Sequence, residues 1–239
     1  MTYSQQFYDR VNDIAERSAR PCIAAITEWH PIESVVDFGC GEGAWLGAWR
    51  AAGALRVRGL DGNWVDSSRL RIARDEFVTA DLATPIDLGV RYDLAQCVEV
   101  AEHLPASAAP VLVATLCRHA PLILFSAAPP GQGGEHHINE QPYAYWQAMF
   151  AKRDFRLFDC LRPRIAAARE VAYWFRYNLF LYAAPAAMAA LPATVRASEI
   201  RLGTAIPDVA PALHRARRHL VRLVPTSLQT RLARLRAQI

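Results

Sequence analysis

Lysine is almost absent from this sequence, since Lys152 is the only lysine among the 27 basic residues of a 239-residue chain. Paired cysteines are absent as well, because the five cysteines are scattered and no CxxC motif occurs. The scattered cysteines argue against a disulfide framework or a zinc site and for a reduced compartment. The first residues lack the pattern of a signal peptide, and Pro or Arg interrupts each long apolar window before the roughly 18 residues that a membrane span needs. We therefore expect a soluble, cytoplasmic protein.

The formal net charge of +4 is unevenly distributed along the chain. Residues 183–239 contain nine Arg and two acidic residues, whereas residues 1–182 contain 18 basic and 21 acidic residues. We predict a domain over residues 1–183 and a basic extension over residues 184–239 with two amphipathic helices, Leu213–Arg222 and Leu228–Ala237. Packing on the domain, dimerisation and contact with a carrier protein or an anionic membrane surface all remain open for these helices.

Strand and helix patterns alternate along the first 183 residues. Short apolar runs predict seven strands, and a helical period predicts the helices before and between them. Short helices between strands imply βαβ crossovers and therefore an α/β fold with a mostly parallel sheet. The predicted strands are 35–38, 56–60, 77–79, 93–98, 122–125, 155–159 and 178–183, and the predicted helices are 4–29, 44–52, 65–73, 106–119 and 142–152.

A glycine-rich loop follows the first predicted strand. Gly39, Gly41 and Gly43 stand at every second position, and a helical pattern begins at Ala44. Glycine after a buried strand lets the backbone turn sharply and lets a ligand approach it closely. The free N–H groups of the following helix favour an electron-rich ligand. The loop alone predicts an adenine-bearing cofactor without saying which one, because nicotinamide-binding folds carry the related G-x-G-x-x-G pattern.

Acidic residues lie at the ends of the first four strands. Asp37 is buried at the end of the first strand and needs a donor, for which a ligand ammonium group is suited. Asp61 ends the second strand, where an acid can accept both hydroxyls of a ribose. Asp81 and Leu82 follow the third strand and can contact an adenine amino group and ring, and Glu99 follows the fourth. Ligands of open α/β sheets bind beyond the carboxyl ends of the strands, so we expect one cofactor site there.

In combination these motifs resemble the class I S-adenosylmethionine (SAM)-dependent methyltransferase family. Asp37-x-Gly39-x-Gly41-x-Gly43 matches its first motif, and the acids after strands two, three and four follow in the expected order. The resemblance covers about residues 7–183 and implies a Rossmann-like, seven-stranded sheet with helices on both faces. It implies SAM as cofactor and S-adenosylhomocysteine as product. The residues expected to bind the cofactor are Asp37, Gly39, Cys40, Gly41, Gly43, Asp61, Gly62, Trp64, Asp81, Leu82, Glu99 and His103.

The loop after the fifth strand carries the candidate catalytic groups, and residues 125–141 resemble a bacterial subgroup of small-molecule methyltransferases. Histidine titrates near neutral pH, so we predict His137 as a general base, oriented by Glu140 or Glu102, with His136 as the second candidate. One of these histidines bracing the next helix is the structural alternative. We expect no metal, because the adjacent histidines of Glu135-His136-His137 do not easily converge on one ion and the usual ligand spacings are absent.

An arginine-rich and aromatic segment separates the last two predicted strands. Arg162, Arg164 and Arg176 are candidates for holding a carboxylate or phosphate of the acceptor, and Tyr173 for the apolar wall of its site.

The predicted function is transfer of a methyl group from SAM to a small-molecule acceptor. An oxygen acceptor, either hydroxyl or carboxylate, in natural-product or saccharide biosynthesis is favoured. The alternatives are N-methylation of a small molecule and an inactive SAM-binding scaffold that acts through the basic extension. DNA is not an expected partner, because residues 99–102 lack the Asn/Asp-Pro-Pro-aromatic tetrapeptide of amino-methylating DNA enzymes.

Overall fold

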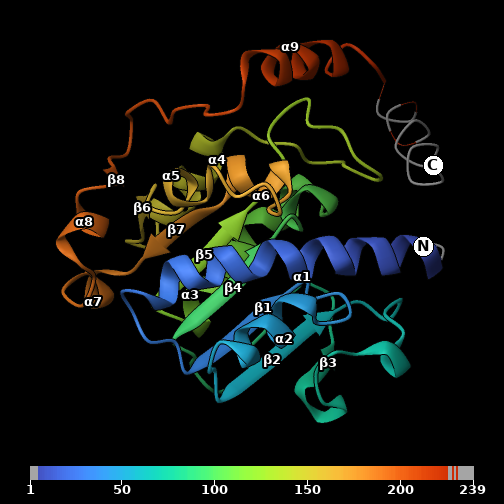
Figure 1. Cartoon of the computed structure of the whole chain (residues 1–239), viewed down its shortest axis with the longest axis vertical. Helices are drawn as coiled ribbons and strands as arrows, with labels where there is room; N and C mark the ends of the chain where they lie inside the picture. The colour runs from blue at the N-terminus through green and yellow to red at the C-terminus, as the bar shows by residue number, and fades with distance from the viewer. Residues whose placement is uncertain (1–4, 226–227, 229, 231–239) are drawn as a thin grey trace.

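The sheet extends in both directions from β1 (Ser34–Phe38), whose five residues are all buried. On one side β2 (Arg56–Asp61) and then β3 (Phe77–Thr79) add in parallel, and on the other side β4 (Leu94–Val98) and then β5 (Leu122–Ser126) do so. The chain therefore reverses its direction of winding between β1 and β4, where open α/β sheets form their ligand crevice. This computed structural model (Figure 1) describes residues 5–225, 228 and 230, with side chains from residue 12 onward.

Three further strands complete one edge of the sheet. β7 (Phe180–Ala183) lies antiparallel between β5 and β6 (Arg156–Phe158), and β8 (Glu199–Ile200) pairs with the outer side of β6. The order is β3-β2-β1-β4-β5-β7-β6-β8. The mostly parallel α/β sheet predicted from the sequence is confirmed, and its eighth strand comes from the segment after residue 183.

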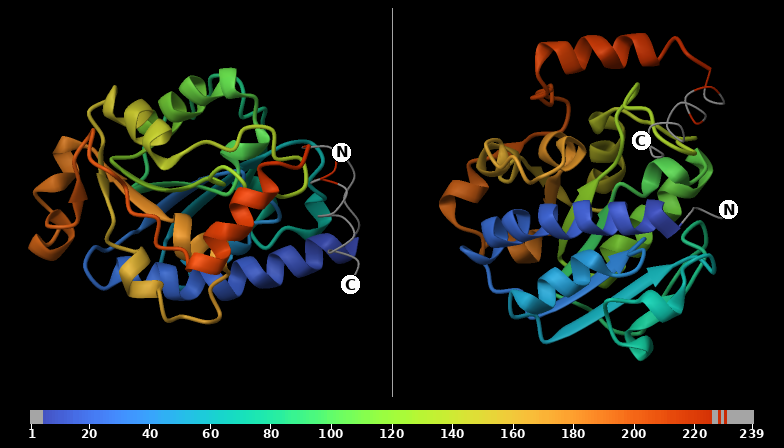
Figure 2. Two further views of the ribbon diagram at one scale, coloured as in Figure 1. Left: turned by 90° about the horizontal axis from the view of Figure 1, so that it is seen from above. Right: turned by 45° about the vertical axis from the view of Figure 1, so that its right-hand side comes forward.

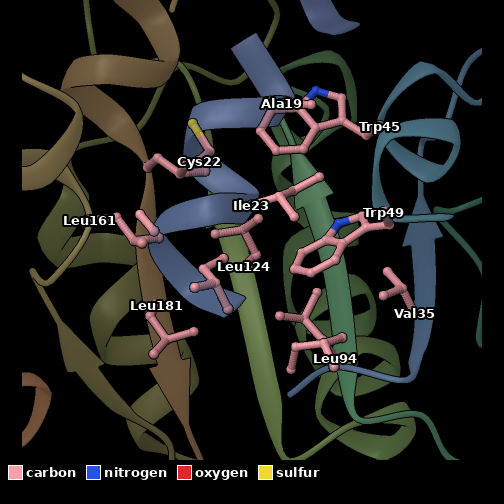
Figure 3. Packing of buried hydrophobic residues seen from close by; sticks show 14 of the residues in the cluster. Ala19, Cys22, Ile23, Val35, Trp45, Trp49, Leu94, Leu124, Leu161 and Leu181 are labelled. Carbon is pink, nitrogen blue, oxygen red and sulfur yellow. The ribbon is translucent and has the colours of Figure 1, made fainter. Parts of the chain in front are cut away.

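Helices cover both faces of the sheet (Figure 2). α1 (Gln5–Thr27), α2 (Ala44–Ala51), α5 (Arg162–Ile165) and α6 (Tyr173–Asn178) contribute to the core on one face, and α3 (Ala109–His119) and α4 (Tyr143–Ala151) to the core on the other. Successive strand residues alternate between the two cores, as Val35 and Val36 do. Trp45 and Trp49 pack against the first core with Ile23 and Leu94 (Figure 3), so both tryptophans serve packing.

The helix predicted over residues 65–73 is wrong. That segment contains only a 3-10 turn, η1 (Ser67–Arg69), and a second turn, η2 (Arg74–Glu76), precedes β3. The physical reason is local, because the Asp66 carboxylate accepts hydrogen bonds from both the backbone N–H and the hydroxyl of Ser68, at 2.9 and 2.7 Å. Such side-chain bonds compete with helix formation. Two further turns, η3 (Ala101–His103) and η4 (Ala106–Ala108), lie between β4 and α3.

The segment after β7 first packs on the domain and adds a strand to the sheet, and only then continues to α9. α7 (Pro185–Met188) and α8 (Ala193–Arg196) precede β8, and Leu191 and Val195 are buried in the core at 1% and 2% exposure. The predicted helix Leu213–Arg222 is confirmed as α9 (Ala212–Val221). The predicted helix 228–237 lies outside the described residues apart from Leu228 and Thr230. No helix in the described part of the chain is both long and apolar enough to cross a membrane.

Candidate functional site

The glycine loop runs directly against the segment that follows β4. Gly39, Gly41 and Gly43 have φ values of 93°, 54° and 87°, which favour glycine. A Cβ atom at Gly39 would lie 2.3 Å from Cγ2 of Val100, so no larger residue fits there. The Val100 side chain therefore packs directly against the backbone of the glycine loop, at the point where the sheet changes its winding direction.

Asp61, at the carboxyl end of β2, is tied to this loop. One carboxylate oxygen accepts the backbone N–H of Gly41 and the other that of Gly62, both at 2.7 Å. Burial nevertheless raises the pKa of Asp61 above its usual value. Each oxygen retains a further lone pair for a ligand hydroxyl. The Trp64 ring packs over Gly62, where a Cβ would be 2.2 Å from it, and the Trp64 side chain also lies close enough to the Asp61 carboxylate to lower its pKa in part.

Asp37 is buried at the end of β1 with few partners. Gln96 donates from Nε2 to one of its oxygens at 2.9 Å, and Trp49 donates from Nε1 to the oxygen of Gln96 at 2.9 Å. Burial first and the charge of Asp61 second raise the pKa of Asp37 well above its usual range. A buried carboxylate in this state is stabilised by a cationic group, so the site suits a ligand that carries an ammonium.

Two other predicted cofactor contacts have different surroundings. Asp81 is exposed after β3 and accepts the backbone N–H of Ala83 at 2.9 Å, next to the buried Leu82. The side chain of Cys40 packs toward Gly59, where a Cβ would lie 2.6 Å from its Sγ. Its thiol therefore belongs to the packing between the loop and β2.

Glu42 lies between two loop glycines and was not among the predicted site residues. It is only 3% exposed and accepts hydrogen bonds from the Asn12 amide and from Nε of Arg69, the latter at 2.7 Å. Its carbonyl accepts the N–H of Arg71 at 2.8 Å. Glu42 thus ties the glycine loop to α1 and to the β2–β3 connection. A charged residue within a glycine loop is the sequence feature that could have identified Glu42.

Glu99, directly after β4, is hydrogen-bonded to the loop after β5 and to α6. Its φ of 55° is in the left-handed region, and its carboxylate accepts the Nε2 group of Gln132 at 2.6 Å. Asn178, at the end of α6, donates to Gln132 Oε1 at 2.7 Å and to Glu99 at 3.4 Å. Burial raises the pKa of Glu99 above its usual value. Gln132 and Asn178 carried no recognisable motif, and only the fold brings them to Glu99.

The loop after β5 is organised by Glu140. This carboxylate accepts the N–H groups of Gly131 and Gly133 at 2.7 Å each and contacts Nδ1 of His137 at 2.9 Å. The structure thus places His137 beside the orienting acid that the sequence analysis named. His136 has a φ of 58°, with Nε2 3.6 Å from Oε1 of Glu135.

A second group of side chains meets His137 from the other side. The rings of His103 and His137 are perpendicular, with their centroids 4.9 Å apart. Ligand atoms of Glu102, His103 and His137 all lie within 4.8 Å of one another. Glu102 is completely buried, and neither of its carboxylate oxygens has a hydrogen-bond partner among the described residues.

The three arginines proposed for the acceptor differ in their surroundings. Arg162 is buried and bonds both oxygens of Asp159 at 2.6 and 2.7 Å, so its guanidinium is committed to the fold. Arg164 pairs with Glu28, which directly follows α1. We therefore leave both out of the acceptor site, which corrects the sequence-based expectation. Arg176 remains, since its buried Nε has no hydrogen-bond partner in the described part of the chain.

α9 lies over these loops at one side of the molecule (Figure 2). Arg217 donates to the carbonyl of Gln132 at 3.2 Å, and the ring of His214 lies 4.7 Å from that of Tyr173. A Cβ at Gly131 would be 2.1 Å from the carbonyl oxygen of Arg218. The basic extension thus contacts both the loop after β5 and α6.

Comparison with known proteins supports a common origin for most of this chain. A family model described as a methyltransferase domain matches residues 6–159. No curated protein sequence matches the chain.

Solved structures share the fold at low sequence identity. The magnesium protoporphyrin IX methyltransferase of Synechocystis PCC 6803, crystallised with SAM, is 21% identical, with a TM-score of 0.53 over 73% of this chain and 81% of that one. An O-methyltransferase family protein from Burkholderia thailandensis is 17% identical, with a TM-score of 0.54 over 74% and 59%. DesVI of Streptomyces venezuelae is 14% identical, with a TM-score of 0.51 over 73% and 93%.

Proposed function

This chain belongs to the methyltransferase domain family, and we propose that it transfers the methyl group of SAM to an oxygen of a small-molecule acceptor. The observation that carries the proposal is the arrangement at the winding reversal of the sheet. There a glycine cradle and two buried carboxylates adjoin a loop that carries an oriented histidine.

The residues at the reversal fit SAM. Asp37 offers a buried carboxylate to an ammonium group, and Asp61 has lone pairs for ribose hydroxyls. The positive φ of the loop glycines leaves backbone without a Cβ next to the ligand. We assign Trp64 and Leu82 to the adenine ring and the exposed Asp81 carboxylate to its amino group. When bound, SAM supplies a methyl group on a positively charged sulfur.

His137 is the group that we assign to proton removal. Its Nδ1 is held by Glu140 at 2.9 Å, which fixes the ring and leaves Nε2 to accept a proton from an acceptor hydroxyl. Orientation of the acceptor contributes as much as the base, since aligning two reactants removes an entropic barrier. His136 is the second candidate for this role.

Arg176 and Tyr173 are the residues that we assign to the acceptor. Both lie on α6, and the guanidinium of Arg176 suits a carboxylate or phosphate of the acceptor. The description of one neighbour, a magnesium protoporphyrin IX methyltransferase, names a small acceptor, and that of another, an O-methyltransferase family protein, names transfer to oxygen. Biosynthesis of a natural product or a saccharide is the setting that we propose.

We propose that α9 contacts a protein partner, either a second copy or a carrier protein. Leu213 and Leu220 on α9 and Leu223 just after it are 84%, 67% and 82% exposed. An apolar stripe of this kind is buried by association. Light scattering on the Leu213→Ser, Leu220→Ser double variant should show loss of any dimer of the parent chain.

Calorimetry with SAM tests the cofactor assignment. The parent chain should bind SAM, and Asp61→Asn should weaken binding about 10-fold or more, because a hydrogen bond to a charged group contributes about 1.5–3 kcal/mol. Asp66→Asn, at an exposed carboxylate nearby, should bind as the parent does. Binding of NADH without binding of SAM would overturn the proposal. Label transfer from methyl-labelled SAM to hydroxyl, carboxyl and amine acceptors then identifies the accepting atom.

A further inference from the structure

We infer that Glu102, His103 and His137 form a binding site for a divalent transition-metal ion beside the cofactor crevice. The sequence-based expectation of no metal considered a different set, the consecutive residues 135–137. The fold instead brings one of those histidines to two residues that follow β4.

The three side chains converge from two separate segments of the chain. Glu102 and His103 belong to η3, and His137 belongs to the loop after β5, with one ligand atom of each within 4.8 Å of the others. Backbone hydrogen bonds hold these segments together, because the carbonyl of Glu102 accepts the N–H groups of Ile138 and Asn139 at 2.9 and 3.0 Å. The Asn139 side chain also donates to the carbonyl of Ala101 at 3.2 Å. The ligand set is therefore assembled before any ion arrives.

Glu102 supplies the independent observation that points to a ligand. Its side chain is 0% exposed, and within the described residues no hydrogen bond of good geometry reaches either oxygen, although the backbone N–H groups of Glu102 and Ala128 lie near the carboxylate. Buried polar groups are almost always paired, and an unpaired one costs free energy. The nearby carboxylates of Glu99 and Glu140 increase this cost by repulsion. A bound cation would satisfy the Glu102 carboxylate and offset the excess negative charge.

The surroundings of His137 match those of a metal-binding histidine. Metal ligands of this type usually donate their second ring nitrogen to a carboxylate, which fixes the tautomer and the ring orientation. Glu140 makes this contact with Nδ1 of His137 at 2.9 Å. Nε2 is then the nitrogen available to the ion.

The composition of the site selects the class of ion. Two imidazoles and one carboxylate suit Mn²⁺, Fe²⁺, Co²⁺ or Zn²⁺, whereas Mg²⁺ and Ca²⁺ prefer oxygen ligands alone. Three protein ligands leave coordination positions open, as catalytic sites require. We therefore expect a catalytic ion rather than a structural one.

The consequence for catalysis rests on the proposed O-methylation. An acceptor hydroxyl bound to the ion would have a lowered pKa and would release its proton to water, as coordinated oxygen ligands do. Nε2 of His137 would then be occupied, so its role as a base would belong to the ion-free enzyme. Binding of the ion itself can be tested without an acceptor.

Calorimetry on the chelator-treated full chain tests the site, with Mn²⁺ and Zn²⁺ as probes and Mg²⁺ as the hard-ion comparison. We expect one Mn²⁺ or Zn²⁺ per chain and no Mg²⁺ binding in the same range. Glu102→Gln should weaken binding more than about tenfold, since even residues behind the ligands change affinity 10- to 100-fold. Glu135→Gln, in the same loop but outside the ligand set, should bind as the parent does. Should Glu102→Gln not fold, His103→Asn at an exposed position serves the same purpose.

Absence of binding to the parent chain, or equal binding to the parent and both ligand variants, would overturn the inference. SAM binding is measured on the same samples. A chain that binds SAM but no ion contradicts the ion site alone, and a chain that binds the ion but no SAM contradicts the proposed function alone.

Discussion

Glu140 contacts Nδ1 of His137 at 2.9 Å while its two oxygens also accept the N–H groups of Gly131 and Gly133 at 2.7 Å. One carboxylate therefore orients the imidazole and shapes the loop that carries it. Glu140, three positions from His137 in sequence, therefore acts together with the proposed base, whether the imidazole accepts a proton or binds an ion.

Replacement of Glu140 by Gln should separate catalysis from cofactor binding. The amide retains one acceptor oxygen and presents an NH₂ group to a backbone N–H, so we expect a loss of about 1–3 kcal/mol in unfolding free energy. Methyl transfer should fall by about 10- to 100-fold, as for other groups that orient a functional histidine. Thermal unfolding and turnover assays measure the two effects. Glu170→Gln, at an exposed position, is the control, and unchanged turnover in Glu140→Gln would contradict the assigned role.

Gly134 provides a steric test of His137. A Cβ at this position would lie 2.1 Å from Nε2 of the imidazole, so Gly134→Ala must displace the ring. We expect turnover to fall by at least about tenfold, because small misplacements of catalytic groups carry large costs, while SAM affinity stays unchanged. Gly47→Ala is the matched control, since its Cβ would meet its nearest atom at 3.7 Å and should stabilise α2 by about 0.5–1 kcal/mol. Equal turnover of the two variants would argue against His137.

The buried Asp37 should make stability depend on pH in a defined direction. Its pKa in the folded protein is well above the usual value of 3.8, because burial and then Asp61 disfavour its charge. The contribution to stability is therefore present below that usual value and is lost as the pH rises through the raised value. Asp37→Asn should gain stability over the ligand-free parent as the pH increases, by about 1.4 kcal/mol per unit of raised pKa.

Thermal unfolding of the parent and of Asp37→Asn between pH 4 and pH 8 measures this difference in stability, since this is roughly the range in which a carboxyl group with a raised pKa titrates. Asp66→Asn should show no such trend over this range, since hydrogen bonds from the Ser68 hydroxyl and backbone hold the pKa of the exposed Asp66 below its usual value of 3.8 and its contribution is lost only as the pH falls below that value. A stability difference for Asp37→Asn that does not change with pH would refute the electrostatic description.

Truncation should show where the folded domain ends. A chain that stops at residue 183 lacks Leu191, Val195 and β8, and loses about 1.5–3 kcal/mol for each large buried side chain. A chain that stops at Ala210 keeps all three and loses α9. We expect cooperative unfolding near the parent temperature for the longer chain and a clearly lower temperature for the shorter one. Equal stability of the two would place the boundary at residue 183.

Much of the fold could be predicted because its signals are local. The first seven strands lie where short apolar runs predict them, and each glycine of the loop after β1 needs a backbone conformation that other residues rarely adopt. The failure over residues 65–73 has a local cause as well, since hydrogen bonds between Asp66 and Ser68 outweighed a weak helical period. The eighth strand was missed because two residues, Glu199–Ile200, carry no detectable period.

The candidate site could be predicted only in part. The acids after the strands follow from the rule that ligands bind at strand ends, and the His137–Glu140 pair from its short separation in sequence. Arg162 was misjudged because nothing in the sequence shows that Asp159 and two backbone carbonyls use its donors. Gln132 and Asn178 were missed because they meet Glu99 from distant segments.

The glycine spacing, the strand pattern and the acids at strand ends are properties of neighbouring residues, and they were sufficient to indicate the family and its cofactor and to predict where the cofactor binds. The meeting of Glu102 and His103 with His137, and the position of α9 over the loop, depend on contacts across more than 30 residues. Such contacts arise from burial and packing of the whole chain, which a local pattern does not encode.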